Sequence, residues 1–368
     1  MLQNFSLAFF ILGWFTGLML FWRLHTLDAD KESGAAPGGG KASVIIPARN
    51  EAHILARLLD SLREQTIKPH EVILVDDNST DGTGTLAQAY GVRVIPLQGE
   101  PPEGWLGKTW ACWQGYLEAR GDLLVFLDAD VVLRPGALEK LLGLQEKHSG
   151  LVSVQPYHRM EKGYENFSLV FNLVVAAAMG VFSAWGSRVK PMGAFGPCLV
   201  CRKEDYEKAG THQGVKGKVL DDIELGKAFS REGIPVKVFL GGRTVSFRMY
   251  PQGFLSLVEG WSKNIASGAG RVGPATRALL FIWITGAMAA GLVVAKGSGH
   301  ILLLGFYFLY GLQVYGAARK IGNFNFLTFF LYPLYFLFFT LLFLVSLIRT
   351  WLFRSVSWKG RSIRLNGK

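Results

Sequence analysis

The chain has 368 residues, of which 50% are hydrophobic and 18% charged, and its formal net charge is +11. A positive charge of this size can indicate nucleic-acid binding, but no recognition motif is present and the basic residues crowd at the ends of apolar runs. The 10 Trp and 26 Phe are many for a soluble protein. The sequence therefore argues against a nucleic-acid partner and favours a protein that contacts a lipid bilayer.

Four apolar runs of about 18 or more residues are each long enough to cross the ~30 Å hydrocarbon core of a membrane. They are Phe5–Trp22, Ala278–Ala295, Ile301–Ala318 and Phe324–Ile348. The sequence between the first and second runs suits a soluble domain instead. We therefore expect an N-terminal anchor (1–27), a flexible glycine-rich linker (28–41), a catalytic domain (42–273), C-terminal membrane helices (274–350) and a basic tail (351–368).

The first apolar run is more typical of a retained anchor than of a cleaved signal peptide. No Lys or Arg precedes Trp22, and no small-x-small cleavage site follows it. Because Arg23 and Lys41 follow the run, the positive-inside rule predicts a multi-pass protein of the cell membrane with a cytoplasmic catalytic domain. Three later spans would place the basic tail outside the cell. We expect it in the cytoplasm, which requires Phe324–Ile348 to bend back at Pro333 or one run to lie flat.

Strand patterns alternate with helix patterns in the central region. Buried strands are predicted at 42–47, 71–75 and 92–96, and the first two precede helices. This alternation predicts an α/β fold with a mostly parallel sheet, in which ligands bind beyond the carboxyl ends of the strands. Three polar clusters follow strands and should meet at that edge: Pro47–Glu51, Asp76–Asp81 and Asp128–Asp130.

Asp128 and Asp130 follow the apolar strand Leu123–Leu127. An extended chain places residues i and i+2 on the same side, so both carboxylates can face one pocket. Two like charges this close favour a nearby cation, and carboxylate oxygens suit Mg²⁺ or Mn²⁺ ions that also bind substrate phosphates. The alternative for so short a motif is a strand-ending turn with two solvated acids. The neighbouring clusters favour the metal site.

The order of these motifs resembles that of the family 2 glycosyltransferases, which have the GT-A fold. The motifs are Val44-Ile-Ile-Pro-Ala-Arg-Asn-Glu51, Val75-Asp-Asp-Asn-Ser-Thr-Asp81, Gly107-Lys108 and Asp128-Ala-Asp130. Three further features resemble the membrane-bound branch of that family. They are the flanking membrane segments, the motif Pro102–Trp110 and the tail motif Ser357–Arg361. This branch glycosylates carotenoid acids such as diaponeurosporenoate, hopanoids and ceramide.

The resemblance implies that the first two motifs bind the nucleotide. The loop with Pro47, Arg49 and Glu51 would hold it, with Glu51 near the ribose. Asp76 would accept a hydrogen bond from the uracil ring. Asn78–Asp81 are better interpreted structurally, because such residues tighten turns and begin helices.

The resemblance assigns the later motifs to the diphosphate and the metal. Asp128 would contact the nucleotide-sugar, whereas Asp130 would bind Mn²⁺ or Mg²⁺, an ion that neutralises charge on the departing UDP. Lys108 could add a positive charge at the phosphates; the alternative is a solvated loop lysine.

The motif Leu220-Asp-Asp-Ile-Glu-Leu225 occupies the place of the family's acceptor motif. Asp222 matches the base that takes a proton from the attacking hydroxyl, and Asp221 stands where Glu is usual. The alternative is an acidic helix N-terminus stabilised by the helix dipole. A carboxylic-acid acceptor would already be ionised near neutral pH, and Asp222 would then orient the sugar instead.

The last family motif, Gln/Arg-x-x-Arg-Trp, is incomplete here. Trp261 matches its Trp, but Leu257 and Gly260 replace the polar positions. Trp261 is expected either to contact substrate or to pack, Lys263 could supply the missing positive charge, and Arg361 in the basic tail could lie near the diphosphate.

Some other features favour structural roles. Cys198-x-x-Cys201 has no second pair and suggests buried thiols in a reducing compartment. The seven histidines show no metal-ligand spacing. The apolar segment Glu165–Trp185 suggests a buried helix or a face that touches lipid.

Together these features predict a metal-dependent, inverting glycosyltransferase. It would move a hexose, with glucose expected, from a UDP-sugar to an apolar lipid of the bilayer such as a carotenoid acid. Two alternatives are a processive polysaccharide synthase and a non-catalytic nucleotide-sugar-binding scaffold. Oligomeric state is not predicted.

Overall fold

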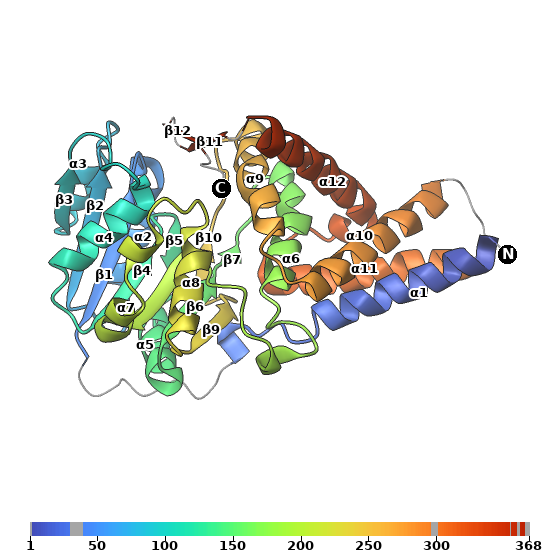
Figure 1. Ribbon diagram of the computed structural model, residues 1–368, viewed down its shortest axis with the longest axis horizontal. Coiled ribbons are helices and arrows are strands. Elements are labelled where there is room, and N and C mark those ends of the chain that lie inside the picture. Colours follow the sequence, from blue (N-terminus) through green and yellow to red (C-terminus); the bar gives the residue numbers. More distant parts are fainter. Residues whose placement is uncertain (1, 30–39, 296–300, 354, 359–360, 365–368) are drawn as a thin grey trace. The chain divides into compact units, whose positions relative to one another are not determined.

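The computed structural model describes residues 2–29, 40–295, 301–353, 355–358 and 361–364. They divide into two compact units (Figure 1). The catalytic unit comprises His25–His158 and Lys190–Arg248, and the membrane unit comprises Met1–Leu24, Arg159–Val189 and Met249–Lys368. The predicted linker, 28–41, lies largely outside the described residues.

A seven-stranded sheet in the order β3-β2-β1-β4-β8-β6-β9 forms the centre of the catalytic unit. Its strands are β1 (Ala42–Ala48), β2 (Glu71–Asp77), β3 (Arg93–Leu97), β4 (Leu123–Leu127), β6 (Leu151–Gln155), β8 (Cys198–Arg202) and β9 (Val236–Leu240). Only β8 runs antiparallel to its neighbours in this sheet. The predicted mostly parallel α/β fold is therefore confirmed.

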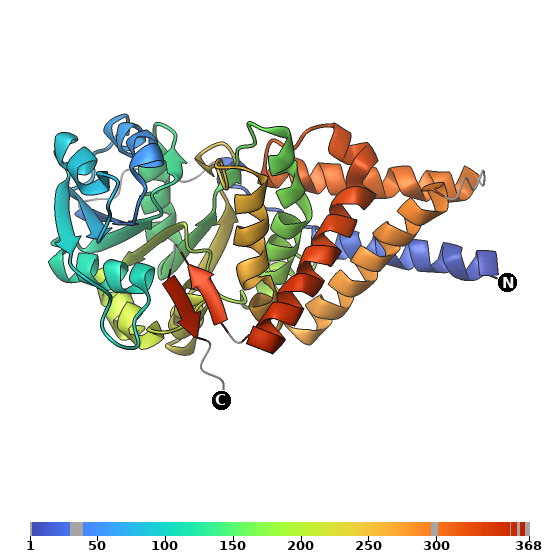
Figure 2. The same cartoon turned by 90° about the horizontal axis from the view of Figure 1, so that it is seen from above.

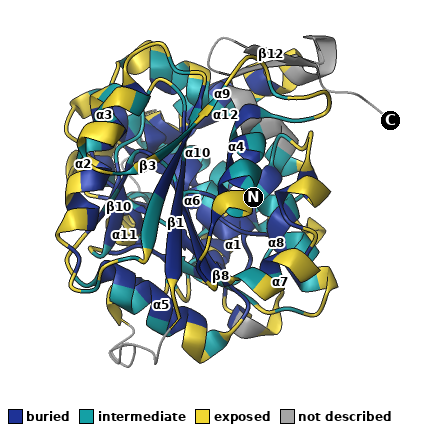
Figure 3. Ribbon diagram, turned by 90° about the vertical axis from the view of Figure 1, so that its left-hand side faces the viewer, coloured by how far each residue is buried: buried dark blue, intermediate teal, exposed yellow. Residues whose placement is uncertain are grey.

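Helices cover both faces of this sheet (Figure 2). They are α2 (Ala52–Arg63), α3 (Thr83–Ala89), α4 (Gly107–Glu118), α5 (Ala137–His148), α7 (Lys203–Lys208) and α8 (Asp221–Arg231). Successive residues of β1 pack into hydrophobic cores on opposite faces of the sheet. Val44 packs with α2 and α5, and Ile45 packs on the side of α4 and α8. The central strands are buried, whereas α2, α3 and α7 expose their outer faces (Figure 3).

A small second sheet pairs β5 (Val131–Leu133), β10 (Val245–Phe247) and β7 (Tyr157–His158) in the order β5-β10-β7. Two short 3-10 helices, η1 (Leu27–Ala29) and η4 (His212–Val215), complete the unit. The three cysteines are buried and free, as expected for structural thiols.

The membrane unit contains α1 (Leu2–Leu20), α6 (Leu169–Ala178), α9 (Phe254–Ala269), α10 (Pro274–Ala295), α11 (Ile301–Ile321) and α12 (Leu327–Phe353), with the 3-10 helices η2 (Gly163–Ser168) and η3 (Gly186–Arg188). Within the described residues α10, α11 and α12 are long and apolar enough to cross a membrane, and α1 contributes a shorter apolar stretch, Leu7–Leu20. Large apolar side chains such as Phe281 and Leu302 are exposed on these helices, as lipid contact requires.

Polar contacts and small residues join these helices. Gln313 on α11 donates to the Trp14 carbonyl of α1 at 2.8 Å and accepts from the Trp283 indole of α10 at 2.9 Å. A Cβ atom on Gly13 would lie 3.2 Å from the Cα of Gly286, so glycine permits close packing of α1 on α10. Such small residues and polar side chains are typical of helix association in lipid.

Two expectations for the membrane unit have clear outcomes. α12 continues through Pro333, so the first of the two alternatives, a reversal within Phe324–Ile348, is wrong. Beyond α12, β11 (Ser355–Trp358) pairs with β12 (Arg361–Arg364). α6 is a short, largely buried helix, which favours the buried-helix interpretation of Glu165–Trp185.

Candidate active site

Three polar clusters lie at the carboxyl edge of the parallel strands in the catalytic unit. Ala48 pairs with Asp76 across β1 and β2, and Ile45 pairs with Phe126 across β1 and β4. Because these strands are parallel and in register, the loops that follow them emerge at the same edge. The predicted convergence of Pro47–Glu51, Asp76–Asp81 and Asp128–Asp130 follows from this register.

Hydrogen bonds join the loops after β1 and β2. The N–H of Asn50 donates to Ser79 Oγ at 2.9 Å, and Asn50 Oδ1 accepts from the N–H of Thr80 at 2.9 Å. Asn50 has φ 54°, a left-handed conformation that asparagine tolerates better than most residues. The N–H of Glu51 donates to Thr83 Oγ1 at 2.9 Å. The two loops therefore form one connected wall.

Asp81 has a structural role in this wall. Its carboxylate accepts from the N–H of Ala52, at the start of α2, and from the N–H of Thr83, at the start of α3, both at 3.0 Å. Burial opposes ionisation of Asp81, but hydrogen bonds from Thr83 and Ala52 lower its pKa below the usual range. This geometry agrees with the structural interpretation of the segment that contains Asp81.

Arg49 and Asp76 lie in the same wall. Arg49 donates to the Asp77 carbonyl at 2.8 Å and lies 3.9 Å from the Asp77 carboxylate, which is only 4% exposed. Asp76 Oδ1 accepts from the N–H of Ser79 at 3.0 Å. A Cβ atom on Gly84 would approach Asp76 Oδ2 to 2.6 Å, so the absence of a side chain at 84 leaves room for that carboxylate.

Lys108, near the start of α4, joins the ends of two other elements. Its Nζ lies 2.8 Å from Asp128 Oδ1, beyond β4, and 3.5 Å from Asp222 Oδ2, on the first turn of α8. Burial disfavours its charge, but Asp128, Asp222 and Asp221 raise the pKa of Lys108 well above the usual range. Lys108 is thus a permanent cation among acids, and the solvated-lysine alternative is wrong.

Asp130 lies in a strongly acidic environment. Burial, Asp128 and Glu51 raise its pKa from 3.8 to about 7, with Lys108 acting in the opposite direction. The ionised form of Asp130 therefore lacks sufficient positive charge around it. A bound divalent cation would supply the missing positive charge. The carboxylate oxygens of this site are the kind of ligand that Mn²⁺ and Mg²⁺ prefer. The residues present fit such an ion.

Asp222 is a second carboxyl group with an unusual environment. Burial and Asp221 raise its pKa to about 7, with Lys108 lowering it. Its Oδ1 is buried and has no hydrogen-bond partner among the described residues. Asp221 behaves differently, because it is buried and accepts from Thr109 Oγ1 at 3.2 Å.

Backbone packing holds α8 against the segment that precedes β8. A Cβ atom on Gly196 would lie 1.7 Å from Asp222 Oδ2, and one on Gly226 would lie 2.5 Å from the Ala194 nitrogen. Gly196 is therefore required for the observed position of Asp222. Sequence reasoning missed this residue, since its partner is distant in the chain.

His212 was also missed. One ligand atom each of His212, Asp221 and Asp222 lies within 4.8 Å of the others. Burial, and secondarily Lys108, lower the pKa of His212 to about 3, so the imidazole stays neutral. His212 Nδ1 lies 2.5 Å from the Tyr206 hydroxyl. The nine-residue separation from Asp221 gave no sequence signal, and the Lys108 ammonium beside Asp222 disfavours a cation in this group.

Three predicted substrate contacts belong to the membrane unit. The Trp261 ring stacks on Phe171 with centroids 4.8 Å apart, and its Nε1 donates to Ser168 Oγ at 3.0 Å. This arrangement gives Trp261 a packing role, the other interpretation that its sequence allowed. Lys263 lies on α9 and Arg361 begins β12, but both side chains lie outside the described ones.

Gly260 replaces a polar position of the family motif for a visible reason. A Cβ atom there would lie 2.1 Å from the Tyr250 ring, so any larger residue would require Tyr250 to move. The Tyr250 ring, in the same unit, thus occupies the space that the family's polar side chain at this position would need.

Comparisons with known proteins agree with this geometry. Residues 43–188 match the model of glycosyl transferase family 2. The chain is 36% identical over 361 residues to a 4,4'-diaponeurosporenoate glycosyltransferase of Staphylococcus aureus (strain MRSA252), covering 95% of this chain and 94% of the relative. The protein of that name from strain USA300 is 36% identical over 359 residues, with the same coverage.

A solved structure shares the fold. A mannosyltransferase from Pyrobaculum calidifontis, in complex with GDP-Man and Mn²⁺, matches with a TM-score of 0.57 at 18% identity, covering 94% of this chain and 99% of that chain. The catalytic unit accordingly has the GT-A fold. With a relative of this similarity along nearly its whole length, the chain belongs to glycosyl transferase family 2.

Proposed function

We propose that this glycosyltransferase moves a hexose, with glucose expected, from a UDP-sugar to an apolar lipid of the bilayer, with inversion at the anomeric carbon. The observation that carries the proposal is the group formed by Lys108, Asp128 and Asp222, in which one Asp222 oxygen is buried and unpartnered among the described residues. The named activity of the Staphylococcus relative supports a carotenoid acid as acceptor.

The donor is proposed to bind along the wall formed by the loops after β1 and β2. Asp76 presents a carboxylate for the uracil N–H, and Pro47, Arg49 and Glu51 surround the nucleoside. Asp128 contacts the nucleotide-sugar and keeps Lys108 near the diphosphate. The ammonium of Lys108 is held by two carboxylates, so it can attract the negatively charged donor while staying in place.

Asp130 is proposed to hold the divalent ion. When bound, that ion would stabilise negative charge on the departing UDP. Asp130 needs to be ionised to bind it, and the raised pKa of about 7 implies that protons compete with the ion below neutral pH. Asp128, two residues earlier, remains paired with Lys108.

Asp222 is proposed to act on the acceptor. With a pKa of about 7, its carboxylate is a much better proton acceptor than an ordinary aspartate while still being largely ionised above that pH. An acceptor hydroxyl would donate its proton to the Asp222 carboxylate. An ionised acceptor carboxylate needs no base, and Asp222 would then position the sugar hydroxyls. Asp221, tied to Thr109, fixes the first turn of α8.

The acceptor is proposed to enter from the membrane. α10, α11 and α12 expose apolar side chains along lengths sufficient for spanning. Basic residues that follow α1, such as Arg23, support a cytoplasmic position for the catalytic unit. A cytoplasmic site would also have direct access to nucleotide-sugars.

The test is transfer by the purified full chain in detergent. UDP-glucose, Mn²⁺ and a carotenoid acid should give UDP and a single glucosylated lipid of opposite anomeric configuration to the donor. The Asp222→Asn variant should bind UDP normally and lose turnover on a lipid acceptor with a hydroxyl group. A polymeric product, or retention of configuration, would overturn the proposal. If UDP-glucose gave no product, other UDP-hexoses would show whether only the sugar assignment is wrong.

A further inference from the structure

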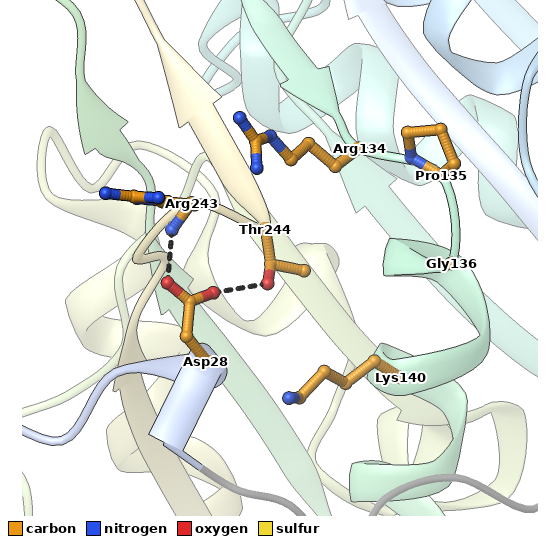
Figure 4. A pocket seen from close by; sticks show the side chains of 7 residues that line it. All are labelled: Asp28, Arg134, Pro135, Gly136, Lys140, Arg243 and Thr244. Carbon is orange, nitrogen blue, oxygen red and sulfur yellow. Dashed lines mark hydrogen bonds between the residues drawn. The ribbon is translucent and has the colours of Figure 1, made fainter.

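A basic cavity lies in the catalytic unit, away from the acidic site. Its volume is about 510 Å³, and its walls include Arg134, Lys140, Arg243, Thr244 and Asp28 (Figure 4). In Figure 4 the Lys140 side chain extends from α5 toward Asp28, whereas the Arg134 side chain, from the loop after β5, extends past Thr244. The cavity thus brings together three segments that are distant in sequence.

The charge of this cavity is unbalanced. The one acid, Asp28, accepts from the N–H of Arg243 and from Thr244 Oγ1, both at 2.7 Å, so its carboxylate is already engaged. None of the three cationic side chains forms an ion pair or side-chain hydrogen bond within the described residues. Such a group of unpaired cations attracts an anion.

Buried contacts fix the walls of the cavity in advance. Gln65, only 2% exposed, donates to the Arg134 carbonyl and accepts from the N–H of Leu138, both at 2.9 Å. The N–H of Arg134 donates to the Thr244 carbonyl at 2.9 Å. Gly242 has φ 56°, and a Cβ atom there would lie 2.5 Å from Asp28. The backbone is therefore held while the charged ends remain available to a ligand.

The cavity is distinct from the proposed donor site. Asp130 precedes β5 and Arg134 follows it, so the length of the strand separates the two, about 13 Å for four residues. An anion in this cavity would not replace the donor diphosphate. The two sites also differ in the sign of their charge, because the cavity is basic and the donor site is rich in acids.

Two of the segments that line the cavity lie only a few residues in sequence from the membrane unit. Trp22, 64% exposed, lies two residues beyond the end of α1, and exposed tryptophan is typical of the membrane–water interface. Asp28 lies six positions after Trp22, which is at most about 21 Å of extended chain. The segment that contains Arg243 is also close in sequence to the membrane unit, because Arg243 lies six residues before Met249, where that unit resumes.

From this cavity we propose a binding site for the phosphodiester headgroup of an anionic phospholipid. Basic pockets beside membrane segments recognise such headgroups through charge and hydrogen bonds to phosphate oxygens. The bound lipid would anchor the catalytic unit at the bilayer. This inference depends on the membrane helices and not on the transfer reaction.

Lipid retention by the full chain tests the proposal. Protein purified in detergent would be titrated with phosphatidylglycerol or phosphatidylcholine, and bound lipid would be counted by native mass spectrometry. The natural chain should retain one phosphatidylglycerol in preference to phosphatidylcholine. The Arg134→Gln/Lys140→Gln/Arg243→Gln variant should bind it at least about tenfold more weakly, since each cation at an anionic surface contributes about fivefold.

A matched variant controls for net charge. Arg202→Gln/Lys208→Gln/Arg231→Gln removes the same residue types from exposed positions that do not line the cavity. It should retain the lipid as the natural chain does, and both variants should bind UDP normally, which shows that they are folded. Equal retention by both variants would overturn the proposal. Displacement of the lipid by millimolar inorganic phosphate would point to a free anion and overturn the lipid assignment.

Discussion

The Asp130→Asn substitution should stabilise the metal-free protein while abolishing its response to metal. Burial, Asp128 and Glu51 raise the pKa of Asp130 from 3.8 to about 7. Below pH 4 the carboxyl is protonated in both the folded and unfolded states. Between about pH 4 and 7 the unfolded chain releases this proton and the folded chain retains it, so stability falls as pH rises through this range. Above pH 7 the loss is complete.

The magnitude follows from the same pKa. The full change corresponds to about 4 kcal/mol. Asp130 is partly exposed, and screening by solvent reduces the expected cost to about 1–2 kcal/mol. Asparagine has a similar shape and no charge, so at pH 8 the variant should melt about 3–6 °C higher than the natural chain. At pH 4 the two melting temperatures should converge.

The assay is a thermal melt of both proteins in detergent at pH 4, 6 and 8, with and without Mn²⁺ and UDP. Ligands that bind the folded state raise its melting temperature, so the natural chain should respond to Mn²⁺ plus UDP at pH 8 and the variant should not. Asp122→Asn, at an exposed acid just before β4, is the control and should change neither property. Equal melting temperatures at pH 8 and equal responses to Mn²⁺ would refute the reasoning.

Four further predictions concern the neighbouring residues. Asp222→Asn should lower turnover on a hydroxyl acceptor by about 10²–10⁴-fold. The kcat/KM of the natural chain should fall as pH drops below about 7, because the base becomes protonated. A flat pH profile between pH 6 and 8 would contradict a base of this pKa. Gly196→Ala should lower the free energy of unfolding by about 1–3 kcal/mol and impair turnover, because the alanine Cβ would overlap the Asp222 carboxylate. Unchanged activity and melting temperature would show that α8 can move freely. Lys108→Met should weaken UDP binding, measured by calorimetry, and unchanged affinity would remove Lys108 from the donor site. Asp81→Ala should lower the melting temperature by an amount equivalent to about 1 kcal/mol, because Ala52 and Thr83 would each lose the hydrogen bond of their backbone N–H. No change in melting temperature would mean that water replaces the carboxylate.

Much of the fold could be predicted because its causes are local in the sequence. The apolar pattern of β1, β2 and β4 and the polar residues after each strand fix a parallel sheet and its ligand-binding edge. The length of the apolar runs predicted α10, α11 and α12. The alternative of a reversal at Pro333 was wrong, since a single proline can be accommodated inside a helix whose neighbours pack around it.

The acidic site could be predicted only in part. Its carboxylates and Lys108 belong to short motifs that sequence patterns reveal. Their mutual arrangement depends on contacts between distant segments, such as Lys108 with Asp222, which no local pattern reports. His212 enters the site through a 3-10 helix, and Gly196 through close packing, so neither has a spacing signal. The basic cavity likewise joins residues from opposite ends of the catalytic unit.

The contact between Gly196 and Asp222 has a consequence for the evolution of this family branch. The two positions lie 26 residues apart in the chain, yet only a hydrogen atom fits where the Asp222 carboxylate approaches the backbone. Drift at position 196 would first displace the acid, so the two residues should be inherited together. A descendant that gains a side chain at 196 can be recognised, from its gene alone, as a candidate for lost or altered acceptor chemistry.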